Sequence, residues 1–225
     1  MQSGALVYRE QNSTFVAGQP TILALHDRGV TCAQLLPLTA MFGSHLRTVA
    51  VEAPLPLSPY SGRNHGGREW FLQSEAGDIE PTTFGDGLFQ VEQFTLGVSA
   101  KHDRSERAPL LLLGIGQGGM LALTMACLWP EMVDGAVAIK ACLPEIQGWS
   151  VPEGPMNGLP IMLVCDTEDT ELSEDMVKRS GRELARRGAG VRLERTIGAE
   201  NLSPSLAELI RDWLPQPFKD GAQNP

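Results

Sequence analysis

The sequence predicts an α/β protein with a doubly wound, mainly parallel sheet, and two patterns along the chain point to this fold class. Short runs that are almost entirely apolar alternate with longer amphipathic runs. A strand that is apolar at every position is typical of a parallel sheet with helices on both faces. Strands that alternate with helices are the signature of the doubly wound class. The length of 225 residues suits one domain with a single core.

Each predicted element is a segment with one of these two patterns. Five core strands are expected at residues 21–25, 47–51, 110–115, 135–139 and 161–165. Helices are expected at residues 31–42, 84–100, 118–128, 173–187 and 204–214. An antiparallel edge strand at residues 5–9 and a last strand at residues 191–195 complete the expected sheet.

Three segments lack a regular pattern. Residues 54–83 are rich in Pro, Gly, Ser and Asn, and a loop of this length in a compact domain is usually functional, often as a lid or a pocket wall. Residues 144–159 form a second irregular segment. The domain is predicted to span residues 1–214, and the mostly polar, proline-containing residues 215–225 are predicted to be a disordered C-terminal tail.

Composition disfavours several classes of function. The 18 Lys and Arg against 27 Asp and Glu give a net charge of −9, and such a surface repels phosphate backbones and anionic lipids. No apolar run approaches the roughly 20 residues of a membrane helix, and the first residues lack the pattern of a signal peptide. We therefore expect a cytoplasmic protein that binds a small molecule and has no nucleic-acid or membrane partner, with a homodimer as a further option.

Cysteine and histidine spacing predicts neither a disulfide framework nor a metal site. No two of Cys32, Cys127, Cys142 and Cys165 form a C-x-x-C pair, and three of the four lie in apolar segments, as buried reduced thiols do. The four histidines are scattered singly and lack the short spacings of a zinc site. The sequence therefore predicts no metal and no cofactor.

The most specific local pattern is the run LLLLGIGQGGM at residues 110–120. An apolar strand leads through a sharp glycine-rich turn into a helix of small residues. This run resembles the nucleophile elbow, G-x-S-x-G, of α/β-hydrolases, with Gly116 in the place of the serine. A phosphate-binding loop is the alternative for a strand–glycine–helix turn, but the spacing G-x-G-x-x-G is not met.

Five further segments resemble, in chain order, the small carboxylesterase, phospholipase and acyl-thioesterase family. They are residues 22–29, 49–54, 67–71, 161–169 and 198–204. The first resembles the strand and loop that build the oxyanion hole, and the fourth resembles the strand and turn that place the catalytic acid at Asp169. The last resembles the histidine loop. The resemblance covers about residues 5–214 and implies an α/β-hydrolase fold.

The chain departs from that family at three functional positions. Gly116 takes the place of the nucleophile, Glu200 takes the place of the histidine, and Asp27 takes the place of a glycine in the oxyanion loop. A glycine has no hydroxyl that attacks a carbonyl. A carboxylate with an ordinary pKa of about 4.3 is a poor base for a serine. Ester hydrolysis by a Ser-His-Asp triad is therefore not expected, whatever the fold implies.

Other residues of the resembling site keep chemistry of their own. The resemblance implies that the amides of Gln117 and Arg28 hold an anion; alternatively Asp27 distorts this hole. Asp169 and Glu200 are expected to face each other and to share a proton; alternatively Glu200 turns to solvent or pairs with a basic neighbour.

Several cationic or ring-bearing residues are also candidates. Lys140 ends an apolar strand, where it neutralises a site carboxylate or binds an anionic ligand, or else is a surface lysine. The basic residues of the glycine-rich loop bind an anionic ligand, or else they are simply solvated. The candidates for ligand binding, besides the amides, are His26, Asp27, Arg63, His65, Arg68 and Trp70.

Three functions remain open. The first is a repurposed enzyme that uses acid/base residues on a small carbonyl compound, which is either neutral or anionic. The second is a non-catalytic pseudo-hydrolase that binds a small ligand or a protein partner. The third is a hydrolase that uses water activated by Glu200 in the space that Gly116 leaves.

Overall fold

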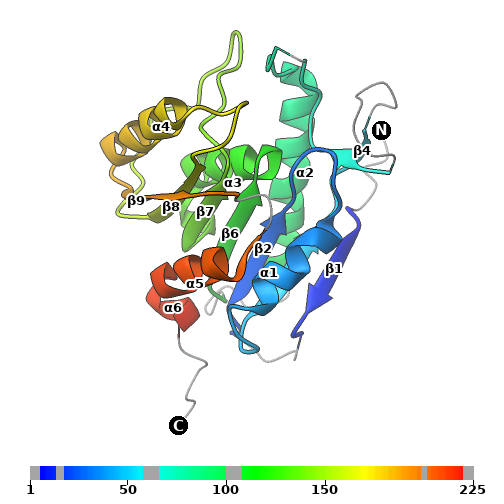
Figure 1. Ribbon diagram of the computed structural model, residues 1–225, viewed down its shortest axis with the longest axis vertical. Coiled ribbons are helices and arrows are strands. Elements are labelled where there is room, and N and C mark those ends of the chain that lie inside the picture. The colour runs from blue at the N-terminus through cyan, green and yellow to red at the C-terminus, as the bar shows by residue number, and fades with distance from the viewer. Residues whose placement is uncertain are drawn as a thin grey trace.

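The computed structural model describes residues 6–13, 18–57, 66–74, 76–99, 108–198 and 202–219. They form a seven-stranded sheet in the order β1-β3-β2-β6-β7-β8-β9. Strand β1 is antiparallel to β3, and the other six strands run parallel (Figure 1). This is the mainly parallel α/β architecture that the sequence predicts.

The central strands lie where the apolar runs predicted them. Their bounds are Thr21–Leu25 (β2), Arg47–Val51 (β3), Leu110–Ile115 (β6), Gly135–Ile139 (β7) and Pro160–Asp166 (β8). Strands β2, β6 and β7 are buried at every position, because helices cover both faces of the sheet. The edges are β1 (Tyr8–Gln11) and β9 (Gly190–Thr196). The predicted edge strand at 5–9 is thus shifted, because pairing with β3 begins at Tyr8.

Two helical layers enclose the sheet. Successive strand residues point to opposite faces, so Leu23 belongs to one hydrophobic cluster and Ile22 to the other. The first cluster includes residues of α2 (Pro81–Ser99), α3 (Gln117–Leu128) and α4 (Glu174–Arg186). The second includes residues of η1 (Cys32–Leu35), α1 (Leu36–Ala40), α5 (Pro204–Trp213) and α6 (Gln216–Lys219). All four cysteines are buried and unpaired.

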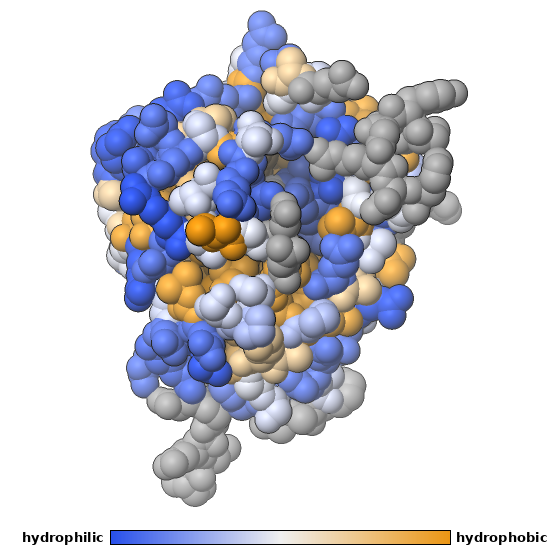
Figure 2. Space-filling model, viewed as in Figure 1, coloured by the Kyte–Doolittle hydropathy of each residue, from blue (hydrophilic) through white to orange (hydrophobic). Residues whose placement is uncertain are grey.

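Helix α4 illustrates how the helical layers bury apolar side chains and expose charged ones. Helix α4 buries Val177 and Leu184 and carries charged residues on its outer side. Figure 2 shows hydrophilic side chains over the α4 region and apolar ones mainly between α4 and α5. No helix within the described ranges combines the length and the apolar character of a membrane span.

Two predicted segments differ from the structure. The helix predicted at 31–42 is divided into η1 and the short α1, which has a proline in its first turn. The stretch predicted as irregular at 54–83 contains a two-stranded ribbon, β4 (Leu55–Pro56) and β5 (Arg68–Glu69), and helix α2 begins within it. Residues 144–159 form no helix or strand, apart from an isolated bridge between Ile146 and Trp149.

The described structure continues past residue 214, where the sequence analysis ends the domain. Helix α6 follows, and Phe218 is fully buried because its ring covers apolar surface beside Leu214. The carbonyl of Phe218 is hydrogen-bonded to Nε2 of His45 at 3.0 Å. The remainder of the predicted tail, residues 220–225, lies outside the described residues.

Candidate functional site

The turn between β6 and α3 has the geometry of an elbow. Gly116 has φ 50° and ψ −116°, a backbone conformation that L-residues rarely adopt. Its N–H donates to the carbonyl of Ile139 at 2.9 Å, which ties the turn to β7. A Cβ at Gly118 would lie 2.2 Å from the carbonyl oxygen of Leu25. The glycines therefore allow strand, turn and helix to approach more closely than side chains would permit.

The carboxylate of Asp27 fills the space above this elbow. A Cβ at Gly116 would lie 1.8 Å from Oδ1 and 2.2 Å from Cγ of Asp27. Such distances are far below any real contact of a Cβ atom, so any side chain at position 116 and this conformation of Asp27 exclude each other. Gly116 and Asp27 thus fit together: the carboxylate on the loop after β2 occupies the room that a side chain at position 116 would need.

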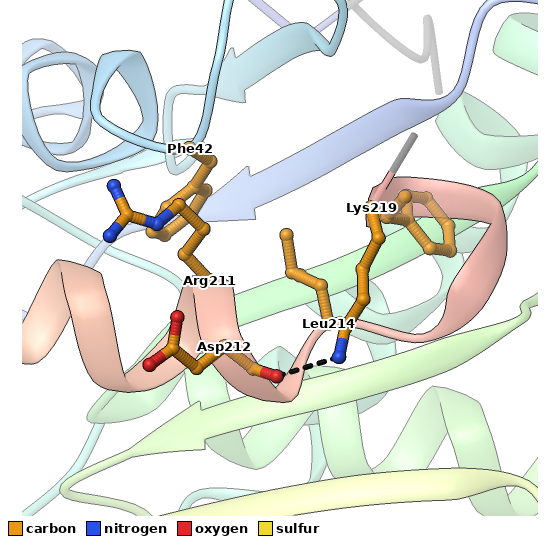
Figure 3. A pocket seen from close by; sticks show the side chains of 6 residues that line it. Phe42, Arg211, Asp212, Leu214 and Lys219 are labelled. Carbon is orange, nitrogen blue, oxygen red and sulfur yellow. Dashed lines mark hydrogen bonds between the residues drawn. The ribbon is translucent and has the colours of Figure 1, made fainter. Parts of the chain in front are cut away.

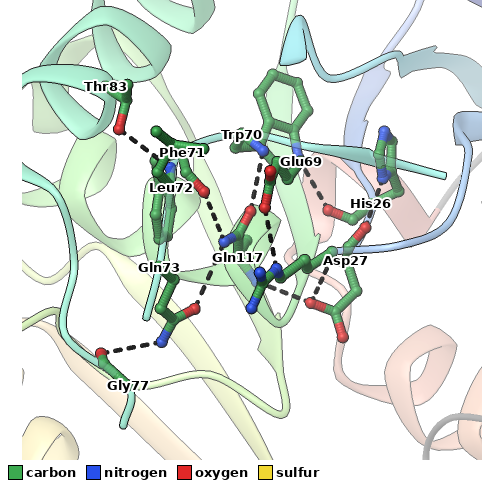
Figure 4. A network of polar contacts seen from close by, with 11 residues as sticks. His26, Asp27, Glu69, Trp70, Phe71, Leu72, Gln73, Gly77, Thr83 and Gln117 are labelled. Atoms are coloured by element: carbon green, nitrogen blue, oxygen red, sulfur yellow. Dashed lines mark hydrogen bonds and ion pairs between the residues drawn. The ribbon is translucent and has the colours of Figure 1, made fainter. Parts of the chain in front are cut away.

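Two backbone amides hold the Asp27 carboxylate in place. Asp27 Oδ1 accepts from the amide of Arg28 at 2.7 Å and from the amide of Gln117 at 3.1 Å (Figure 4). Gln117 is the first residue of α3, where amides are not paired within the helix and favour a negative charge. The two amides that the sequence analysis selects do converge on one oxygen, and that oxygen belongs to the protein itself.

The side chains of the same residues are also engaged. Arg28 Nε lies 2.9 Å from Oε2 of Glu69, whose side chain is 1% exposed against 21% for Arg28. Gln117 Oε1 accepts from the amide of Trp70, and its Nε2 donates to the carbonyl of Phe71, both at 2.9 Å. The sequence analysis does not select Glu69 as a site residue, because a glutamate next to Arg68 in a predicted loop gives no indication of burial.

His26 and Trp70, two candidates for ligand binding, are fully buried behind the Asp27 loop. His26 Nε2 accepts from the amide of Ala53 at 2.9 Å. The neutral ring therefore carries its proton on Nδ1, which donates to the carbonyl of Asp27 at 2.7 Å. Trp70 Nε1 donates to the carbonyl of His26 at 2.9 Å. Both rings thus support the loop from within and do not face its exposed side.

Burial of His26 should make the protein less stable below neutral pH. Burial lowers the pKa of His26 below its ordinary value of 6.5, against smaller opposite effects of the Asp27 carbonyl and of Glu52. As the pH falls through 6.5, the unfolded chain binds a proton at this histidine and the folded chain does not. The free energy of unfolding should therefore decrease between about pH 8 and about pH 5.5, and part of this decrease should be absent from His26→Gln. Urea titrations of both proteins measure it; equal slopes would contradict the assignment.

Lys140 and Asp169 form an ion pair next to the elbow. Lys140 Nζ lies 3.3 Å from Asp169 Oδ2, and the side chains are 17% and 8% exposed. Asp169 Oδ1 accepts from the amides of Glu171 and Leu172 at 2.8 and 3.0 Å. Lys140 directly follows Ile139, whose carbonyl holds Gly116, and has a positive φ of 49°. Of the roles predicted for Lys140, neutralisation of Asp169 is supported by the geometry among the described residues.

Removal of one partner of this pair should cost more than removal of both. Lys140→Met leaves the carboxylate of Asp169 without its cation and should lower the free energy of unfolding by about 2 kcal/mol, less than for a fully buried pair because Lys140 is partly exposed. The double variant Lys140→Met/Asp169→Asn should lose less than Lys140→Met alone. Chemical denaturation of the natural chain, the double variant, Lys140→Met and Asp169→Asn gives the coupling energy, and a value near zero would mean that solvent screens the pair.

The remaining candidates divide into two groups. Arg68 donates from Nε to the carbonyl of Ala53 and from a terminal nitrogen to the carbonyl of Pro54, so its guanidinium braces the chain after β3. Arg63, His65 and Glu200 lie outside the described residues, as does any pairing of Glu200 with Asp169. Within the described ranges, no three His, Cys, Asp or Glu side chains are placed to share a metal ion.

A cavity of about 300 Å³ lies away from the elbow, between the end of α5, α6 and Phe42 (Figure 3). Leu214 and Phe218 form its apolar side, and Arg211, Asp212 and Lys219 its polar side. Lys219 Nζ donates to the carbonyl of Asp212 at 2.7 Å. Phe42 precedes β3, so this cavity is at the edge where the parallel strands begin, opposite to the elbow.

Solved structures with the same architecture include carboxylesterases. A carboxylesterase from Mesorhizobium loti is 20% identical with a TM-score of 0.78 and covers 95% of this chain and 96% of its own. The Bacillus cereus carboxylesterase is 18% identical with a TM-score of 0.75, covering 94% of each chain. A phospholipase/carboxylesterase from Dyadobacter fermentans is 15% identical with a TM-score of 0.70, covering 94% and 97%.

These similarities show that the chain has the α/β-hydrolase fold, as the sequence resemblance implies. At such identities the likeness extends to the fold and not to the chemistry. No protein-family model matches the chain, and no curated protein matches its sequence.

Proposed function

We propose that this chain is a non-catalytic hydrolase-fold protein that binds a small ligand at the elbow and does not turn over esters. The observation that carries the proposal is the position of the Asp27 carboxylate. It occupies the space of a side chain at Gly116 and takes the hydrogen bonds of both Arg28 N–H and Gln117 N–H. One side chain thus removes the place of the nucleophile and the place of the oxyanion together.

The two enzymatic alternatives fit this geometry less well. Stabilisation of a developing oxyanion requires donors that are aimed at the substrate oxygen and are free to bind it. Here the same donors bind a carboxylate, and a second negative charge at that point would be repelled. A hydrolase that relies on water next to Gly116 is also disfavoured, because Asp27 fills the space that this water would need.

Ester hydrolysis tests the proposal directly. We expect no turnover of p-nitrophenyl acetate or p-nitrophenyl butyrate above the buffer rate, and no labelling by a fluorophosphonate probe. Asp27→Gly should be equally inactive, because it frees the amides but supplies no nucleophile at Gly116. Turnover by the natural chain that disappears in both Asp27→Asn and Asp27→Gly would make Asp27 catalytic and would refute the proposal.

A second candidate is an acid/base enzyme centred on Lys140 and Asp169. It is favoured by the positive φ of Lys140, since strained non-glycine residues cluster at functional sites, and by the shielded ion pair beside the elbow. Exchange of α-protons of small ketones and 2-oxo acids into D₂O, followed by NMR, tests it. Exchange that Lys140→Met abolishes would establish this candidate, and exchange at the buffer rate for every compound would argue against it.

A further inference from the structure

The position of Asp27 inverts the polarity of the elbow. Two converging amides attract a negatively charged oxygen, but in this chain that oxygen is Asp27 Oδ1. Oδ2 of the same carboxylate accepts no hydrogen bond from the described residues, and Figure 4 shows it directed away from the network of donors. Asp27 is itself half-buried, so solvent reaches it. The elbow therefore presents a hydrogen-bond acceptor where the fold elsewhere presents donors.

The charges around Asp27 leave its carboxylate in excess. Arg28 forms an ion pair with Glu69, and Lys140 forms one with Asp169, so each cation is matched by an acid of its own. Asp27 has no ion pair with a described residue. His26 adds no positive charge, because its Nε2 accepts a hydrogen bond and burial lowers its pKa. Arg68 and Glu52, whose charges also act on His26, are opposite in sign and cancel in this balance. The described groups around Asp27 thus leave one negative charge uncompensated.

We propose that the elbow binds the primary ammonium group of a small amine, with Asp27 Oδ2 as its acceptor. This inference rests on the proposed function and names the ligand class of that same site. The amides of Arg28 and Gln117 fix the carboxylate before the ligand arrives, which reduces the entropy lost on binding. An ammonium group brings a positive charge and three donors.

An ammonium fits this site better than the other cations or any anion. A divalent metal ion needs several oxygen ligands, and the described residues place no group of three metal-binding side chains together. A carboxylate or phosphate ligand would meet the charge of Asp27 and would find both amides engaged.

The test compares two probes with the same number of carbon atoms and opposite charge, butylammonium and butyrate. Titration of the ¹⁵N-labelled full chain with each probe is followed by the amide signals of Arg28 and Gln117. We expect butylammonium to shift both signals saturably and butyrate to leave them unchanged. The natural chain, Asp27→Asn and Asp27→Gly are titrated in parallel, and the dispersion of their spectra verifies that each is folded.

Both variants should lose affinity for butylammonium, but only Asp27→Gly should gain affinity for butyrate. In Asp27→Asn the side-chain oxygen keeps the two amides, and an NH₂ donor replaces Oδ2, so affinity for butylammonium should fall at least tenfold. In Asp27→Gly the amides of Arg28 and Gln117 become free, so butyrate should now bind and butylammonium should not.

Three results would overturn the inference: no saturable shift with butylammonium, equal or tighter binding of butyrate by the natural chain, or undiminished butylammonium binding by Asp27→Asn. None of these concerns ester turnover. Failure of amine binding would therefore leave the non-catalytic assignment standing, whereas ester turnover by the natural chain would remove that assignment whatever the amine titrations show.

Discussion

Gly116→Ala should destabilise the protein by on the order of 2–6 kcal/mol, because two costs add. An L-residue at φ 50° and ψ −116° is strained, which costs about 1–3 kcal/mol. The new Cβ also overlaps Asp27 Oδ1 at 1.8 Å and forces the carboxylate off its two amides, with about 1–3 kcal/mol more for overpacking. Urea denaturation followed by tryptophan fluorescence measures the change.

Two control variants separate these costs. Gly97→Ala lies in α2 with no atom near the new Cβ and without a positive φ, so it should be neutral or stabilising by up to about 1 kcal/mol. In Gly116→Ala/Asp27→Gly the overlap is gone and the strain remains, so the double variant should lose less than the sum of the single variants. Additive losses would show that Asp27 does not fill the space above Gly116.

Gly116→Ser extends the argument from stability to chemistry. The serine suffers the same strain and overlap. By the resemblance in sequence, we expect Glu200 where a hydrolase has its histidine. The variant should therefore be unstable and should not hydrolyse p-nitrophenyl esters, because a carboxylate is a weak base for a serine hydroxyl. Measurable ester hydrolysis by Gly116→Ser alone would refute this view of Glu200.

The central sheet could be predicted almost to the residue because burial on both faces leaves a direct trace in the sequence. Strands β2, β6 and β7 are buried at every position, so their residues are almost all apolar and the apolar runs end where the strands end. Strand β1 leaves no such trace, since its position is set by pairing of Tyr8 and Gln11 with β3. Helix α6 was missed for a similar reason, because burial of Phe218 depends on residues that are far away in the sequence, such as Phe42.

The site could be predicted only in part. The elbow is local, so the glycine pattern around Gly116 was sufficient to place it. The resemblance in sequence singles out Gly116 and Asp27, but does not indicate that the carboxylate of Asp27 fills the space above Gly116. The signal that could have revealed this contact is a smaller side chain at position 116 together with a larger one at position 27, because the two positions face each other in the fold. Glu69 has no signal at all, since a charged residue in a predicted loop is ordinarily solvated.

Arg28→Met should lower the free energy of unfolding by about 3 kcal/mol, because it leaves a carboxylate that is almost fully buried without a cation. The loss should lie at the lower end of the range for buried pairs, since Arg28 itself is 21% exposed. The side chain of Glu69 is 1% exposed, so water cannot replace the guanidinium. Chemical denaturation at neutral pH measures the loss.

A solvated ion pair and a neutral isostere provide the controls. Arg179→Met breaks the pair with Glu145, whose members are 58% and 71% exposed, and should change stability by no more than about 0.5 kcal/mol. Arg28→Met/Glu69→Gln should be more stable than Arg28→Met, because a buried amide costs less than a buried unpaired charge. If Arg28→Met/Glu69→Gln is no more stable than Arg28→Met, then lost packing of the arginine stem, and not the charge of Glu69, causes the instability.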